Sequence, residues 1–215
     1  MKNRSVPFAR MRYWLTLLAA CAVVFAGTSA AAQQNEAGPS AVVERLHDAL
    51  LDVMRNAGEL GFRGRRARLA PVLRDVYDFS FVSRVVVGRH WGSLSDKERS
   101  TMVDVFSRLT VATYANRFDG YDGERFVTRA SRDLGEDRAV VRTEIVGSDG
   151  EATRLDYLLE RRGDGWRIVN VIADGVSDLA LKRAEYSRII RREGFETLIA
   201  RLEAQIADYA AEAGS

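Results

Sequence analysis

Cysteine is almost absent from this chain of 215 residues. The single cysteine, Cys21, lies in the N-terminal segment, so the rest of the sequence offers neither a disulfide nor a thiol nucleophile. Histidine is nearly as rare, and neither His47 nor His90 has a second histidine or a cysteine at the spacing of a metal site. The sequence therefore predicts no metal, no cofactor and a fold held by its core alone.

Other chemical motifs are missing as well. The sequence has no Gly-x-Ser-x-Gly motif and no glycine-rich phosphate loop. Lys and Arg number 32 against 30 Asp and Glu, which leaves no basic excess for nucleic acid. Asp156 and Tyr157 could form the acid and phenol of an isomerase, but neighbouring strand residues point to opposite faces. An enzyme is therefore the weaker interpretation.

The N-terminal segment has the pattern of an export signal. Four basic residues precede the apolar run 13–26, and the small residues 30–32 fit a cleavage site, so we expect a signal peptide over 1–32 and a linker over 33–39. Removing it leaves 28 basic residues, a net charge near −2, and a periplasmic protein. The residues before Cys21 also resemble a lipoprotein cleavage box, but the apolar run continues past Cys21, which favours export without a lipid anchor.

Helical periodicity occurs on both sides of a central region. The first helix is expected from an N-cap at Ser40 to a close at Gly58 and Gly61, and Pro71 should kink or start the next. An N-cap at Asp78 and a capping box at Ser95–Glu98 predict two more helices, the second running to about 118. After residue 178 the pattern predicts two final helices separated at Gly194.

Between these helices the hydrophobic period changes from 3.6 to 2. Four β-rich runs follow at 125–130, 139–146, 153–160 and 166–173, joined by short turns. The order predicts an α+β fold with a four-stranded antiparallel sheet over 124–174, a helical part over 40–120 and C-terminal helices over 178–209, all within one domain of residues 40–210. Several strands are apolar on both faces, as at Val140 and Val141, so we expect cover on both sides or a cavity on one.

Two polar features are interpreted as ordinary surface. His47 lies on the polar side of its predicted helix, which indicates a solvated side chain. The basic run 63–68 also has the pattern of a solvated helix face, although it could meet lipid headgroups or an acidic partner.

Several blocks of the sequence resemble the MlaC (toluene-tolerance) family, and together they span roughly residues 42–206. They are the segment from Tyr77 to Trp91, Leu94-Ser95 with its helix to Tyr114, Arg154-Leu155-Asp156-Tyr157, the stretch from Gly165 to Ser177, and Arg188 to Phe195 with Leu198. The Gly163-Asp164-Gly165-Trp166 hairpin and the Arg89-His90-Trp91 segment resemble in particular the hopanoid-associated HpnM branch of this family.

The resemblance implies a periplasmic lipid carrier with an NTF2-like sheet and an apolar cavity between sheet and helices. It also implies a phospholipid or hopanoid cargo, an inner-membrane transporter of ABC or RND type, and an outer-membrane lipoprotein complex as partners. From sheet face and helix pattern we expect these residues to line the pocket: Trp91, Tyr114, Val141, Ile145, Leu155, Tyr157, Leu159, Val169 and Val171. The alternatives are a small NTF2-like enzyme and an envelope adaptor that binds no lipid.

Overall fold

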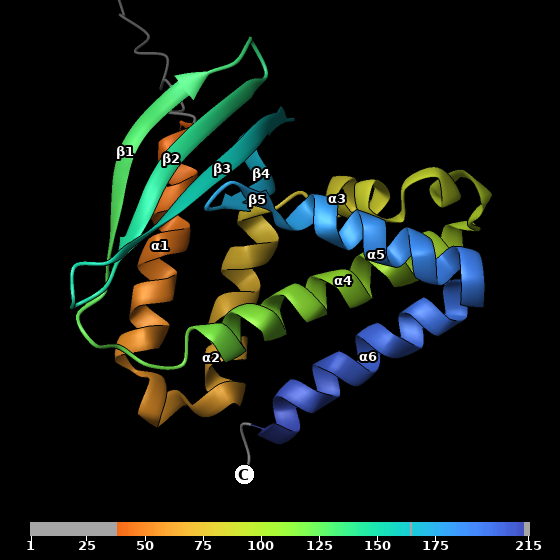
Figure 1. The fold of residues 1–215 in the computed structure, drawn as a ribbon, viewed down its shortest axis with the longest axis horizontal. Coiled ribbons are helices and arrows are strands. Elements are labelled where there is room, and N and C mark those ends of the chain that lie inside the picture. Colours follow the sequence, from red (N-terminus) through yellow and green to blue (C-terminus); the bar gives the residue numbers. More distant parts are fainter. Residues whose placement is uncertain (1–37, 164, 213–215) are drawn as a thin grey trace, which may run out of the picture. The chain divides into compact units, whose positions relative to one another are not determined.

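The computed structural model describes residues 38–163 and 165–212, which belong to one unit of the chain. The predicted signal peptide, Cys21 and nearly all of the predicted linker lie outside these residues. Within them the α+β prediction is confirmed: four helices and a short 3-10 helix precede an antiparallel sheet, and two helices follow it (Figure 1).

The helices begin where local chemistry favours a start. Their bounds are α1 Pro39–Arg55, α2 Ala57–Val76, α3 Phe79–Val87, η1 Gly88–Ser93, α4 Asp96–Arg117, α5 Asp178–Glu193 and α6 Phe195–Glu212. The Asp78 side chain accepts from the Phe81 amide at 2.8 Å, which caps α3 as predicted. The capping box of Ser95 and Glu98 is present at the start of α4.

The start and end of α1 differ from the prediction. Gly38 is the N-cap and Pro39 is the first helical residue, so Ser40 lies inside the helix. Proline suits this position because its φ is already helical and its missing amide would be unpaired there. α1 ends at Arg55, whereas Gly58 and Gly61 belong to α2. A kink occurs within α2 at Gly61, whose φ is 55°, and not at Pro71.

The sheet has five strands rather than the four predicted. The strands β1 Arg125–Asp133, β2 Arg138–Val146, β3 Ala152–Arg162, β4 Gly165–Ala173 and β5 Val176–Ser177 pair in sequence order as an antiparallel meander. The fifth strand follows a two-residue turn at Asp174 and Gly175, both with positive φ. Two residues are too few to show an alternating pattern, which explains why β5 was missed.

A bulge in β4 changes which side chains share a face. Leu158 pairs with Asn170 and Leu159 pairs with Ile168, so Val169 is the extra residue. Ile168 therefore lies on the same face as Leu159, and both Ile168 and Val169 are buried. Simple alternation along β4 would have placed Ile168 and Val169 on opposite faces of the sheet.

The helices cover one face of the sheet. α1 packs against β1, β2 and β4, and α5 packs against β4 (Figure 1). On the other face Arg142 is exposed, Val140 and Leu158 are only half-buried, and Arg154 pairs with Asp156 at 3.2 Å. Of the two alternatives that the sequence left open, cover on both faces does not hold for β2 and β3. Asp156 and Tyr157 point to opposite faces, as predicted, so they form no acid–phenol pair.

Candidate functional site

A cavity of about 410 Å³ lies between the inner face of β3 and β4 and the helices α4, α5 and α6. Its volume is within the range of small-molecule sites, about 300–1,000 Å³. Most of its inner wall is apolar, and the residues that form this part are Phe79, Val82, Phe106, Leu109, Phe118, Leu155, Val169, Val171, Ala173 and Leu179.

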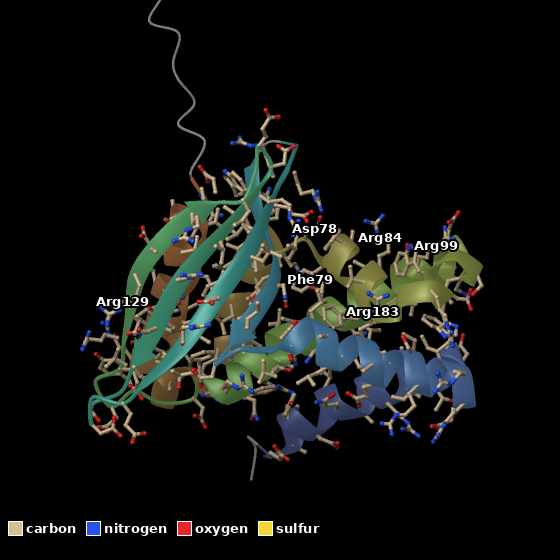
Figure 2. All side chains as sticks on the ribbon, turned by 45° about the horizontal axis from the view of Figure 1, so that its top comes forward. Asp78, Phe79, Arg84, Arg99, Arg129 and Arg183 are labelled. Carbon is tan, nitrogen blue, oxygen red and sulfur yellow. The ribbon has the colours of Figure 1, made fainter. Side chains whose placement is uncertain are left out.

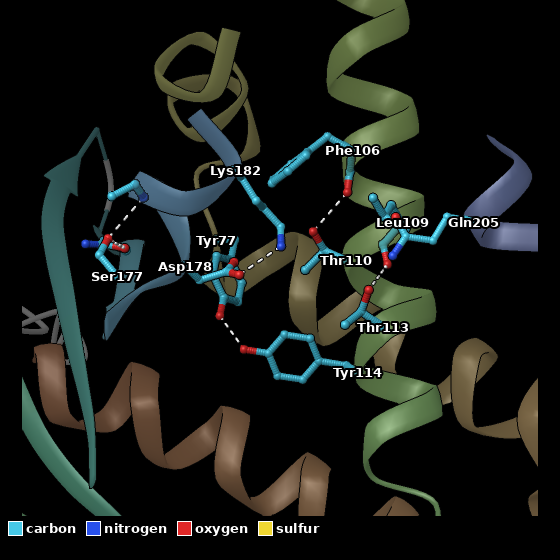
Figure 3. A network of polar contacts seen from close by, with 12 residues as sticks. Tyr77, Phe106, Leu109, Thr110, Thr113, Tyr114, Ser177, Asp178, Lys182 and Gln205 are labelled. Atoms are coloured by element: carbon cyan, nitrogen blue, oxygen red, sulfur yellow. Dashed lines mark hydrogen bonds and ion pairs between the residues drawn. The ribbon is translucent and has the colours of Figure 1, made fainter. Parts of the chain in front are cut away.

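Two half-buried tyrosines meet in the wall of the cavity. The hydroxyl oxygens of Tyr77 and Tyr114 are 2.6 Å apart in a hydrogen bond (Figure 3). Burial raises the pKa of Tyr114 to about 12 and that of Tyr77 well above its ordinary value, so both phenols stay neutral. One hydroxyl donates and the other accepts, so this single bond leaves one phenolic proton available inside the cavity, within a wall that is otherwise mainly apolar.

The threonines of α4 are satisfied in a similar way. Thr110 donates to the Phe106 carbonyl and Thr113 donates to the Leu109 carbonyl, each at 2.9 Å (Figure 3). These hydroxyls are bonded within their own helix and need no ligand. Few polar groups in the site are therefore available to form hydrogen bonds with a bound molecule.

Tyr157 joins the cavity to the filled part of the core. Its hydroxyl oxygen lies 3.0 Å from Nε2 of His47 on α1, and the His47 ring stacks on Phe126 at 4.0 Å between centroids. The prediction of a solvated His47 is wrong: its side chain is only 4% exposed. Burial lowers the pKa of His47 from 6.5 to about 4, so this imidazole is neutral near neutral pH.

The charged groups of the site gather at its exposed rim. Lys182 donates to Asp178 at 2.8 Å, and Gln205 donates to the Tyr209 hydroxyl at 3.0 Å. Val176 and Leu181 also line the cavity, and they are 53% and 60% exposed. The polarity of the site is therefore sorted, with apolar surface inside and charges and exposed aliphatic groups at the mouth.

Five of the nine residues predicted to line a pocket line this cavity: Tyr114, Leu155, Tyr157, Val169 and Val171. The other four lie elsewhere. Val141 and Leu159 are fully buried in the hydrophobic core, and Ile145 pairs with Phe126 and Thr153 farther along the sheet. Period-2 alternation identifies the inner face of the sheet but cannot tell which half of it a helix fills.

Trp91 lies in a different, open cleft of about 820 Å³, beside Arg99, Arg162 and Arg167. It belongs to η1, where Arg99 Nε donates to its carbonyl at 3.3 Å. A 3-10 turn has no apolar periodicity from which a facing direction could be predicted.

The sequence prediction missed most of the α4 wall. Phe106, Leu109, Thr113 and Tyr114 recur at helical spacing and all line the cavity. That pattern was visible in the sequence, but it only indicated a buried helix face.

The basic run of α2 is not a uniform surface patch. Arg65 is buried, and its guanidinium donates to the carbonyls of Ala115 at 2.9 Å and Ala57 at 3.2 Å. Arg68 pairs with Asp52 at 2.8 Å. Arg65 therefore ties α2 to α4, so the prediction of a solvated face is wrong at this position.

The described part of the chain shows no cluster of three or more His, Cys, Asp or Glu side chains placed to bind a metal. None of its helices is both long and apolar enough to span a membrane.

Comparison with known families gives one match over most of the chain. The family model described as MlaC protein matches residues 44–204. The chain belongs to the MlaC family. A relative from Haemophilus influenzae, the intermembrane phospholipid transport system binding protein MlaC, is 22% identical over 90% of this chain and 93% of its own length.

Two further comparisons agree with this. The toluene tolerance protein ttg2D of Pseudomonas putida is 25% identical over 57% of this chain and 58% of its own length. A solved structure from Ralstonia solanacearum, described as a phospholipid-binding protein in complex with a phospholipid, superposes with a TM-score of 0.72. It is 21% identical and covers 81% of this chain and 99% of its own. The fold of this MlaC-family chain is thus shared with that structure.

Proposed function

We propose that this chain is a periplasmic phospholipid carrier and that the apolar cavity between β3–β4 and α4–α6 holds the acyl chains. The observation that carries the proposal is the distribution of polarity in this cavity, with a mainly apolar wall inside and charged side chains at its mouth. The family supports it, since the Haemophilus relative is named for phospholipid transport and the Ralstonia structure contains a phospholipid.

The physical chemistry of the cavity suits a carrier. Each methylene group hidden from water contributes about 0.8 kcal/mol, so an acyl chain gains affinity without directional bonds. A wall of aliphatic and aromatic carbon makes few demands on the exact position of the chain. Cargo held in this way can be released to a partner without breaking a hydrogen-bond network.

The proposal includes the surroundings of the carrier. An exported MlaC-family protein would receive and deliver lipid between an outer-membrane lipoprotein complex and an inner-membrane transporter of the ABC type. The name of the Haemophilus relative favours phospholipid over hopanoid as the cargo. The family relationship also favours carriage over catalysis and over an adaptor with a filled core.

Two leucines on β3 provide a matched test. Leu155 and Leu158 are both half-buried, but only Leu155 lines the cavity, while Leu158 lies on the outer face. A carboxylate at Leu155 would face acyl chains, and burying a polar group unpaired costs about 1–3 kcal/mol, so Leu155→Asp should lower lipid content by about tenfold or more. Leu158→Asp should retain its lipid.

The measurement is native mass spectrometry with lipid extraction on protein purified without detergent. Circular dichroism would establish that both variants are folded. A phospholipid mass on the native protein and on Leu158→Asp, but not on Leu155→Asp, supports the proposal, and a hopanoid mass would change the cargo. A native protein that carries no lipid and takes none from vesicles would contradict it and favour the adaptor alternative.

A further inference from the structure

The outward face of α5 combines exposed aliphatic and basic side chains. α5 buries Tyr186 and Ile189. On the opposite side, Leu181, Ala184, Arg188 and Arg192 follow one another at helical spacing, and Arg191 lies beside them. All five are exposed, and the exposed Glu185 lies on the same side of the helix, so this side carries three positive charges and one negative charge. We call these five residues the α5 stripe.

The arginines of the α5 stripe are not balanced by carboxylates. Within the described residues, the side chains of Arg188, Arg191 and Arg192 make no ion pair or hydrogen bond, whereas nearby Lys182 pairs with Asp178 and Arg201 pairs with Glu193. The chain as a whole has 32 basic against 30 acidic residues, so three unpaired arginines on one face are a local excess. An anionic surface would complement them.

Additional basic residues lie beside the stripe. Arg183 is exposed on α5 next to Gly88, where a β-carbon added to the glycine would come within 3.4 Å of the Arg183 Nε atom. Figure 2 shows Arg183 on α5 near α3, which carries the exposed Arg84. Neither arginine has a carboxylate partner among the described residues, so the positive field extends from α5 onto α3.

The stripe is continuous with the mouth of the cavity. Leu181 belongs to the stripe and lines the cavity, and Val176 of β5 lines the same cavity. Both are among the few large hydrophobic side chains that are strongly exposed in the described residues. From Leu181 to Arg192 the helix advances about 16 Å at its usual rise. A flat surface resting on the stripe would therefore also meet the cavity mouth.

We propose that the α5 stripe docks onto an anionic phospholipid bilayer, with Leu181 and Val176 at the acyl boundary and the arginines among the phosphates. This inference rests on the proposed function, because it says how the mouth of a lipid cavity reaches lipid. Helices that lie in a membrane interface combine apolar and basic side chains in this way. Electrostatic attraction to anionic lipid adds to the burial of apolar side chains.

The test is co-sedimentation of the full purified protein with two kinds of vesicle, phosphatidylcholine alone and phosphatidylcholine mixed with phosphatidylglycerol. One variant replaces Arg188, Arg191 and Arg192 by glutamine. The matched control replaces Arg125, Arg132 and Arg142, which are also exposed and unpaired but lie on the sheet, where the register places them on its outer face. Both variants lose the same charge. Lipid content is measured on every sample.

The α5 variant should bind the anionic vesicles at least about tenfold more weakly at low salt, while the sheet variant stays within about twofold of the native protein. Leu181→Ser should also weaken binding. Equal loss in both arginine variants, no loss in either, or no binding by the native protein would overturn the inference. If the native protein carries lipid but shows one of these results, only the docking inference fails. If it carries and accepts no lipid, the proposed function fails as well.

Discussion

The two halves of the inner face of the sheet differ in how tightly the helices pack against them. Where α1 packs against the sheet, the space is filled, with His47 stacked on Phe126 of β1 and hydrogen-bonded to Tyr157 of β3. Where β3 and β4 face the helices α4, α5 and α6, the space is not filled, and a cavity of about 410 Å³ remains. Val141 and Leu159 in the filled half lie on the same face of the sheet as Leu155 and Val171 at the cavity, so the face of the sheet alone does not decide which residues meet the cavity.

Replacing a leucine by alanine should lower the free energy of unfolding by different amounts in the two halves. Leu46 on α1 is fully buried, so Leu46→Ala should lower the free energy of unfolding by about 2–5 kcal/mol, the usual range for creating a new cavity. Leu155→Ala only enlarges an existing space and should cost about 1 kcal/mol, close to its transfer free energy alone. Urea unfolding of both variants checks this. Equal losses would mean that the cavity half is as tightly packed as the other.

The filled half should also make stability depend on pH. The pKa of His47 is about 4 in the folded state and 6.5 ordinarily, so between these values the unfolded state binds the extra proton. Stability from this group is fully present above its ordinary pKa and is lost as the pH falls from there towards 4. Between about pH 7 and about pH 5 the loss should be about 2 kcal/mol.

The control for this effect is His47→Gln, which cannot titrate. The difference in unfolding free energy between the native protein and this variant should shrink or reverse as the pH falls. A difference that stays constant over this range would show that His47 does not titrate on unfolding.

The smallest expected change in the free energy of unfolding is for the pair Tyr77 and Tyr114 in the cavity wall. Tyr114→Phe removes one partner of the hydrogen bond to Tyr77 and should cost about 1 kcal/mol or slightly more, because the Tyr77 hydroxyl is left buried without it. Lipid content should remain, since acyl chains do not use this bond. Thermal unfolding and lipid extraction of the same sample check both parts. Loss of lipid would assign the hydroxyl pair a binding role.

The sequence predicted the helices and strands better than it predicted which residues from distant elements pack together. Capping residues such as Ser95 and the alternation in the strands are local signals, and the structure confirms the elements that they indicated. His47 was misplaced because its partner Tyr157 lies 110 positions away, and no local pattern indicates a buried pair of that kind. The faces on which Ile168 and Val169 lie depend on a β-bulge, which alternation alone cannot locate.

The candidate site was predicted in part for the same reason. Leu155, Tyr157 and Val171 were selected as inner-face residues and do line the cavity. Val141 and Leu159 share that face and lie in the solid core instead. The boundary between core and cavity is set by the position of α1, which depends on tertiary packing.

The most direct test of the account is where an acyl chain lies in the loaded protein. Methyl NMR spectra would be recorded with a phospholipid that carries a spin label near the end of one chain. We predict strong broadening for Leu155, Val169 and Val171, and much weaker effects for Val43 and Val141 in the filled half. Broadening confined to the filled half, or spread evenly over both halves, would contradict the assignment of the cavity as the lipid site.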